Sequence, residues 1–169
     1  MYYRHNLDYQ YPDKCDQHMI EVKHLRDVNC DENYPYLQKS AFFKLQRGLL
    51  HVCQYTVLPL VMWLRHGLHI HGREKLKQHK DVLKDGMITI SNHVFMWDYI
   101  CIMVALRPRL GYFPAWQTNL EGPNGPWIRM AGGIPIPTHS LRAMVSFKRA
   151  MEEVLETKQW MHFFPEGFM

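Results

Sequence analysis

From residue 68 onward the chain alternates strand-like runs with helix-like segments, and this alternation constrains the fold more than any other feature of the sequence. The predicted strands are Leu68–Gly72, Met87–Ile90, Gly111–Ala115 and Trp160–Phe164, and the predicted helices are Arg73–Leu83, Met96–Leu106 and Leu141–Thr157. Such alternation favours an α/β fold in which a mostly parallel, mixed sheet is flanked by helices.

The last predicted helix is amphipathic. Charged and apolar side chains alternate along it at helical spacing, which indicates one face in the core and one in solvent. The apolar stripe comprises Leu141, Met144, Val145, Met151, Val154 and Leu155.

An apolar segment at residues 40–66 precedes the alternating region and contains no acidic residue. It predicts a helix broken near Pro59. Its uncharged part is marginal for a membrane span of about 20 residues, so we expect the segment to lie in the membrane interface rather than to cross it. A helix pair buried in a soluble core is the alternative.

Three regions follow from these patterns. Residues 1–39 form a polar N-terminal arm, with a short helix expected around Gln17–Arg26. Residues 40–66 form the apolar, membrane-associating helical segment, and residues 67–169 form the α/β domain.

Charge is distributed unevenly along the chain. Residues 1–40 hold five Lys and Arg against seven Asp and Glu, whereas residues 41–169 hold fifteen against nine. A basic surface that is also apolar suits an anionic membrane or a phosphorylated, acyl-bearing ligand, and the dense cationic cluster of a nucleic-acid binder is missing. An ordinary solvated basic surface is the plainer interpretation.

Cysteine usage and the histidines argue against disulfides and metals. The four cysteines lie far apart without a CxxC pair, which indicates a reducing environment facing the cytosol. His66, His69 and His71 lack a Cys or carboxylate at ligand spacing, so we interpret them as exposed histidines rather than a metal site. The N-terminus shows no secretory signal.

The stretch SNHVFMWD places an imidazole and a carboxylate where a predicted strand gives way to a turn. At the carboxyl edge of a parallel sheet, such turns collect ligand-handling side chains. Asp98 can fold back to His93, which would fix the ring tautomer and leave the other nitrogen free as a general base. A structural histidine beside a helix-capping Asp is the alternative.

Two further segments add to this turn. In HFFPEG, Pro165 and Gly167 force a turn that would present Glu166 at the same sheet edge as His93. In GGIPIP, the double glycine allows close backbone approach. No GxSxG motif and no Cys accompanies the histidine, so the attacking hydroxyl or water would come with the substrate.

Taken in order, three blocks resemble the glycerolipid acyltransferase family typified by lysophosphatidic acid acyltransferase. They are NHVFMWD (Asn92–Asp98), GGIPIP (Gly132–Pro137) and FPEG (Phe164–Gly167), and the resemblance covers Leu68–Gly167. It implies a glycerol-phosphate acyltransferase-like fold.

The resemblance also implies the chemistry. His93, oriented by Asp98, would take the proton from a hydroxyl of a lysophospholipid or glycerol-phosphate acceptor, which then attacks the thioester of acyl-CoA or acyl carrier protein. No metal and no cofactor beyond this co-substrate is expected, and no nucleic acid. The residues that the resemblance assigns to substrate binding are Asn92, Gly132, Gly133, Arg142, Glu166 and Gly167.

The chain departs from the family pattern in two places. An Arg usually follows the middle block within two positions, whereas Arg142 is the first cation here, so we expect Arg142, Arg129 or a helix N-terminus near Ser140 to meet a phosphate. FPEG is followed by Phe-Met rather than by Ser or Thr and Arg, and the chain stops before the family's later proline-containing block, as a truncated domain would.

The leading hypothesis is therefore a membrane-associated O-acyltransferase at the cytoplasmic face of a membrane, either monotopic or peripheral. A catalytically impaired, lipid-binding relative is one alternative. A thioester hydrolase, in which His93 and Asp98 activate water, is the other.

Overall fold

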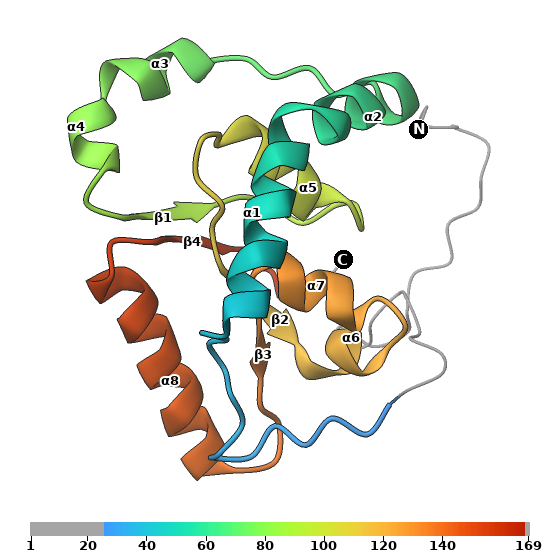
Figure 1. Ribbon diagram of the computed structural model, residues 1–169, viewed down its shortest axis with the longest axis vertical. Helices are drawn as coiled ribbons and strands as arrows, with labels where there is room; N and C mark the ends of the chain where they lie inside the picture. Colours follow the sequence, from blue (N-terminus) through green and yellow to red (C-terminus); the bar gives the residue numbers. More distant parts are fainter. Residues whose placement is uncertain (1–25, 168–169) are drawn as a thin grey trace.

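All strand pairings among the described residues, 26–167, of the computed structural model are parallel (Figure 1). Strand β1 (Met87–Ile90) pairs with β4 (Trp160–Phe163), and β2 (Phe113–Trp116) pairs with β3 (Gly133–Ile136). A parallel bridge between Tyr112 and Met161 links the two pairs. The expected α/β class is confirmed, but the described strands form two small parallel sheets joined by this bridge rather than the single mixed sheet that was expected.

Helices pack on both sides of these strands. Figure 1 shows α8 on one side and α5, α6 and α7 on the other. The cores differ accordingly: one contains Ile134, Phe147 and Met161, and the other contains Leu50 and Phe113. The helices are α1 (Ala41–Tyr55), α2 (Val57–His66), α3 (Arg73–Gln78), α4 (Lys80–Leu83), α5 (Asp98–Ala105), α6 (Gln117–Glu121), α7 (Gly125–Ala131) and α8 (Leu141–Glu156).

Several predicted elements are found within a few residues of their expected bounds, namely β1, β2, β4, α5 and α8. The predicted strand Leu68–Gly72 is wrong: the segment is an irregular connection between α2 and α3. Its alternating side chains fit a strand, but no neighbouring strand pairs with it, and Gly67 and Gly72 at its ends have φ values of 62° and 78°. The predicted helix at 17–26 lies almost entirely outside the described residues.

The segment at residues 121–137, EGPNGPWIRMAGGIPIP, is rich in Gly and Pro and contains a helix and a strand that the sequence analysis did not predict. It contains α7 and β3, which begins at Gly133. Pro126 lies in the first turn of α7, where its missing N–H costs nothing, and Gly132 ends the helix in the left-handed region. Residues that read as turn formers therefore serve here as the start and end of one helix.

The buried face of α8 differs from the predicted apolar stripe. Leu141 is 87% exposed, and Met144, Val145 and Leu155 are also exposed. Because α8 is wedged closely against β3 and β4, small residues share the buried face with larger ones. The buried residues of the helix are Ala143, Phe147, Ala150 and Val154.

The apolar segment forms two helices that break at Thr56 rather than at Pro59. Pro59 lies in the first turn of α2, where a backbone donor is not needed. Arg47 ties α1 to the domain by donating to the carbonyls of Leu110 (2.9 Å) and Ala131 (2.8 Å).

The opposite face of α1 and α2 stays apolar and uncovered. None of the helices within residues 26–167 combines the length and the apolar content that a transmembrane helix needs. The exposed apolar residues of the two helices are Phe42, Leu45, Leu49, Val52, Tyr55, Val57, Leu60, Val61, Trp63 and Leu64.

Gly132 lies at a close approach of three segments. Its φ is 107°, and a Cβ there would lie 2.6 Å from both Arg47 Nη1 and the carbonyl oxygen of Gly111. The glycine thus permits α7, the start of β2 and α1 to meet.

Replacing Gly132 by Ala should lower the free energy of unfolding by about 2 kcal/mol or more, because the new methyl group meets a backbone oxygen and a strained φ. The matched change Gly48→Ala, at an exposed site within α1 with no atom within 4 Å of the added Cβ, should raise it by about 0.5–1 kcal/mol. Urea unfolding of the two variants measures both. Equal stabilities would refute the packing role and favour direct substrate contact by Gly132.

Candidate active site

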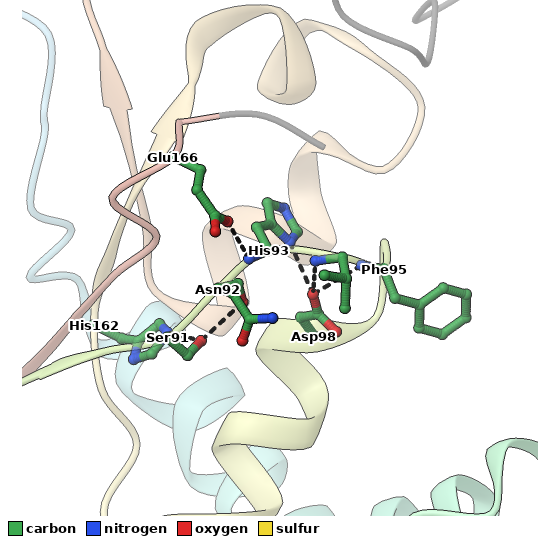
Figure 2. Close-up of polar contacts among 8 residues, drawn as sticks. Ser91, Asn92, His93, Phe95, Asp98, His162 and Glu166 are labelled. Atoms are coloured by element: carbon green, nitrogen blue, oxygen red, sulfur yellow. Dashed lines mark hydrogen bonds and ion pairs between the residues drawn. The ribbon is translucent and has the colours of Figure 1, made fainter. Parts of the chain in front are cut away.

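The polar residues of the site come from two turns that follow adjacent strands. Because β1 and β4 are parallel, their carboxyl ends lie at the same edge, and Ser91 N–H continues the ladder by donating to Phe163 O (3.2 Å). The turn after β1 carries His93, and the turn after β4 carries Glu166. Figure 2 shows His93 between Glu166 and Asp98.

Asp98 holds the turn through one carboxylate oxygen. Its Oδ2 accepts the backbone N–H of Val94 (2.7 Å) and of Phe95 (2.8 Å) and lies 3.0 Å from His93 Nδ1. Asp98 is the first residue of α5 and makes no capping bond within that helix. The helix-capping alternative is therefore wrong, because this carboxylate folds back onto the preceding turn.

This contact defines the state of the imidazole. A carboxylate only accepts, so Nδ1 of His93 carries the proton, and in the neutral ring Nε2 has the free lone pair. None of the residues 26–167 hydrogen-bonds to Nε2. The His93 side chain is 22% exposed and that of Asp98 16%. The pair has the arrangement of a general base and its orienting carboxylate.

Glu166 joins the second turn to the first. Its Oε2 accepts the backbone N–H of His93 at 2.6 Å. The turn itself is closed by Gly167 N–H donating to Phe164 O (3.0 Å), with Gly167 at a φ of 79°. Phe164 stacks on the His93 ring, with centroids 4.3 Å apart and planes at 23°. The predicted meeting of Glu166 and His93 is thus found, through the backbone.

Of the other residues predicted to bind substrate, Asn92 lies at the turn of His93, and the two glycines lie elsewhere. Asn92 is exposed beside His93. Gly132 and Gly133 are buried at the amino-terminal end of β3, whereas His93 follows the carboxyl end of the parallel strand β1. A Cβ on Gly133 would lie 2.6 Å from Ile128 Cγ2, so packing alone explains the double glycine.

The two candidate arginines also have other neighbours. Arg129 donates to the backbone carbonyls of Gly133 (2.9 Å), Tyr36 (2.7 Å) and Pro35, and burial lowers its pKa. Arg142 lies in the first turn of α8, and only Glu32 pairs with it among the described residues, at 4.0 Å. Its contact with a phosphate stays a prediction.

His162 is a residue that the sequence analysis did not place in the site. It is 2% exposed in β4, and its ring lies against the side chains of Thr89 (Nδ1 to Oγ1, 2.8 Å) and Ser91 (Nε2 to Oγ, 3.2 Å). Burial lowers its pKa to about 4, with a further contribution from His93. In the sequence, the only indication that His162 belongs to the site is its position directly before FFPEG.

Within residues 26–167, no Ser, Thr or Cys side chain is hydrogen-bonded to His93. Ser91 Oγ instead donates to the Asn92 carbonyl (3.1 Å). Burial raises the pKa of Cys101, and Asp98 raises it further, which disfavours its thiolate. The arrangement therefore suits direct attack by a hydroxyl group of the substrate rather than an acyl-enzyme.

His66 ends α2, and His69 and His71 follow it in the connection to α3. Among the described residues, no three His, Cys, Asp or Glu side chains come close enough together to hold a metal ion. His66 instead contacts the rings of Phe95 (5.3 Å) and Trp97 (6.2 Å). It thereby packs the end of α2 against the turn that carries His93.

Comparison with known proteins identifies one family. A family model described as "Acyltransferase" matches residues 67–168, which is more than half of the chain. No curated protein and no solved structure matches.

The low pKa of His162 predicts a pH-dependent stability. The unfolded chain binds this proton near pH 6.5 and the folded chain near pH 4, so the stabilisation is complete above pH 6.5 and is lost as the pH falls to about 4. The loss amounts to about 3 kcal/mol. Urea unfolding of the natural chain and of His162→Gln between pH 7 and 4 measures it. An identical pH dependence in both proteins would contradict the prediction.

Proposed function

Because the chain belongs to the glycerolipid acyltransferase family, we propose that it transfers a fatty acyl group from a thioester donor to a hydroxyl group of a lysophospholipid or glycerol-phosphate acceptor. The donor is acyl-CoA or acyl carrier protein, which acts as a co-substrate, and the proposal includes no metal or other cofactor.

The observation that carries this proposal is the hydrogen bond from His93 Nδ1 to Asp98, which leaves Nε2 as the acceptor. Nε2 takes the proton of the acceptor hydroxyl as its oxygen attacks the thioester carbonyl carbon. The carbon–sulfur bond then breaks, and the leaving thiolate receives the proton from the imidazolium. Asp98 stabilises that imidazolium and keeps the ring in one orientation.

Glu166 has a positioning role in this proposal. Its carboxylate holds the backbone N–H of His93, so the two turns move as one unit. The stacked Phe164 ring limits rotation of the imidazole from the other side. Both contacts favour a single direction for Nε2, which is the requirement for proton transfer at a fixed site.

The proposed location is the surface of a membrane, on its cytoplasmic face. The uncovered face of α1 and α2 is apolar, and the exposed cations Lys44 and Arg65 lie on the same helices without any acidic residue. His66 links the end of α2 to the turn of His93 through Phe95 and Trp97. A lipid held under these helices would therefore lie close to the base.

Acyl transfer is tested by thiol release from a long-chain acyl-CoA, with and without lysophosphatidic acid. We expect acceptor-dependent release that falls by about 10²–10⁴-fold in His93→Ala and in Asp98→Asn, because each change removes the oriented base. His69→Phe, at an exposed site in the α2–α3 connection, is the control and should retain activity. Acceptor-independent release would indicate a hydrolase. No release would favour an impaired lipid-binding relative.

Membrane association is tested by sedimentation with anionic phospholipid vesicles. Glu in place of both Leu45 and Leu49, which are 70% and 64% exposed, should weaken binding by at least about tenfold without unfolding the protein, since a charge there opposes insertion. Leu141→Glu, at an 87% exposed position on α8, is the matched control. Equal loss in both variants, or no vesicle binding by the natural chain, would contradict the proposed surface.

A further inference from the structure

His162 is a fully buried polar side chain directly beneath the proposed catalytic turn. It pairs across the β1–β4 ladder with Thr89 and is 2% exposed. Buried imidazoles need partners for both ring nitrogens. Both partners of this ring come from the segment that leads into His93. Packing alone would not require this connection.

The geometry explains why a five-membered ring with two nitrogens fits here. Thr89 lies on β1, and Ser91 directly follows the strand and extends its ladder, so the two side chains, two positions apart, point to the same face. His162 Nδ1 lies 2.8 Å from Thr89 Oγ1 and Nε2 lies 3.2 Å from Ser91 Oγ, so one ring spans both hydroxyls. Ser91 Oγ also donates to the Asn92 carbonyl (3.1 Å), which is the peptide group that enters His93. Figure 2 shows this connection from His162 through Ser91 to the turn.

A second contact reaches the base from the other strand. The His162 ring meets the edge of Phe164 at a centroid distance of 4.6 Å, and Phe164 stacks on His93 at 4.3 Å. His162 is therefore connected to both structures that border His93: to the backbone that precedes it through Ser91 Oγ, and directly to the Phe164 ring that covers it. Within residues 26–167, the hydrogen-bond partners of the His162 ring are Thr89 and Ser91, and the ring makes no hydrogen bond to His93.

We propose that His162 is a positioning residue for His93, which sets the Ser91–Asn92 backbone and the Phe164 ring so that the imidazole faces Asp98 with its Nε2 directed at the acceptor hydroxyl. The inference rests on the proposed acyl transfer and deepens it. An apolar residue at this position would fill the space but would leave the two hydroxyls without their shared partner.

The neutral state of His162 is part of this role. Burial and the nearby His93 both lower its pKa, so it carries no charge at neutral pH. Because Ser91 Oγ gives its one proton to the Asn92 carbonyl, Nε2 of His162 donates to Ser91 Oγ, and Nδ1 accepts from the Thr89 hydroxyl. The other titratable groups that face His93 are Asp98 on α5 and Glu166 on the turn after β4. A neutral His162 adds no positive charge beside the imidazolium that forms during transfer.

The test compares His162→Phe, Ser91→Ala and the double variant with the natural chain. Each single change should lower kcat about 10–100-fold with KM changed less than about twofold, because the base is misdirected while the substrate still binds. The double variant should be no worse than His162→Phe, since both act through one contact. His162→Gln, whose amide keeps a donor and an acceptor, should recover most of the activity.

Nitrogen NMR of the His93 ring provides a readout that does not depend on turnover. In the natural chain Nδ1 should carry the proton, and this tautomer preference should weaken in His162→Phe and in Ser91→Ala as the contact with Asp98 loosens. His69→Phe, an exposed control, should leave the tautomer and kcat unchanged. Thermal unfolding of each variant, with His162→Gln as the milder change, separates this effect from loss of folded protein.

Three results would overturn the inference. One is a kcat that falls only in proportion to the folded fraction, with the His93 tautomer unchanged. Another is a fall in kcat of the double variant that equals the product of the falls in the two single variants. The third is a natural chain in which the His93 ring shows no preferred tautomer. If the natural chain releases no thiol at all, the proposed transfer fails, and the NMR comparison still decides whether His162 positions His93.

Discussion

The parallel pairing of β1 with β4 is the interaction on which the site depends. These strands are 70 residues apart in sequence, and their register places Thr89 beside His162 and Ile90 beside Phe163. The two turns that follow can therefore meet at one edge, where Glu166 accepts the His93 N–H. A slip of one residue would turn every side chain of a strand to the opposite face and would separate His162 from its hydroxyl partners.

The carboxylate of Asp98 joins local folding to chemistry in one atom. Its Oδ2 accepts two backbone N–H groups of the turn and faces the ring nitrogen of His93. The same carboxylate oxygen therefore fixes both the geometry of the turn and the tautomer of the proposed base.

The helices of the apolar segment are asymmetric in a way that the sequence pattern does not reveal. Their inner side buries Phe43, Leu50 and Met62. It is also tied to the domain by polar residues: Arg47 donates to the carbonyls of Leu110 and Ala131, and the buried Gln54 donates to Met103 O (2.6 Å) and Arg109 O (3.0 Å). A second set of apolar side chains is left on the outside. Neither a simple buried helix pair nor a free interfacial helix describes this arrangement.

The sequence by itself determined the α/β class, the principal strands and helices, and the pairing of His93 with Asp98, because these features depend on local periodicity and on residues five positions apart. It also placed Glu166 at the correct sheet edge, since a Pro-Glu-Gly turn follows a strand. Only the tertiary structure decided that Gly132 and Gly133 serve close packing, that Arg129 binds backbone carbonyls, and that Leu68–Gly72 has no strand to pair with. The same holds for His162, whose proposed positioning role depends on its contacts with Thr89 on β1 and with Ser91 directly after that strand. Contacts between distant segments depend on register and on how the layers stack, and no local pattern along the chain contains that information.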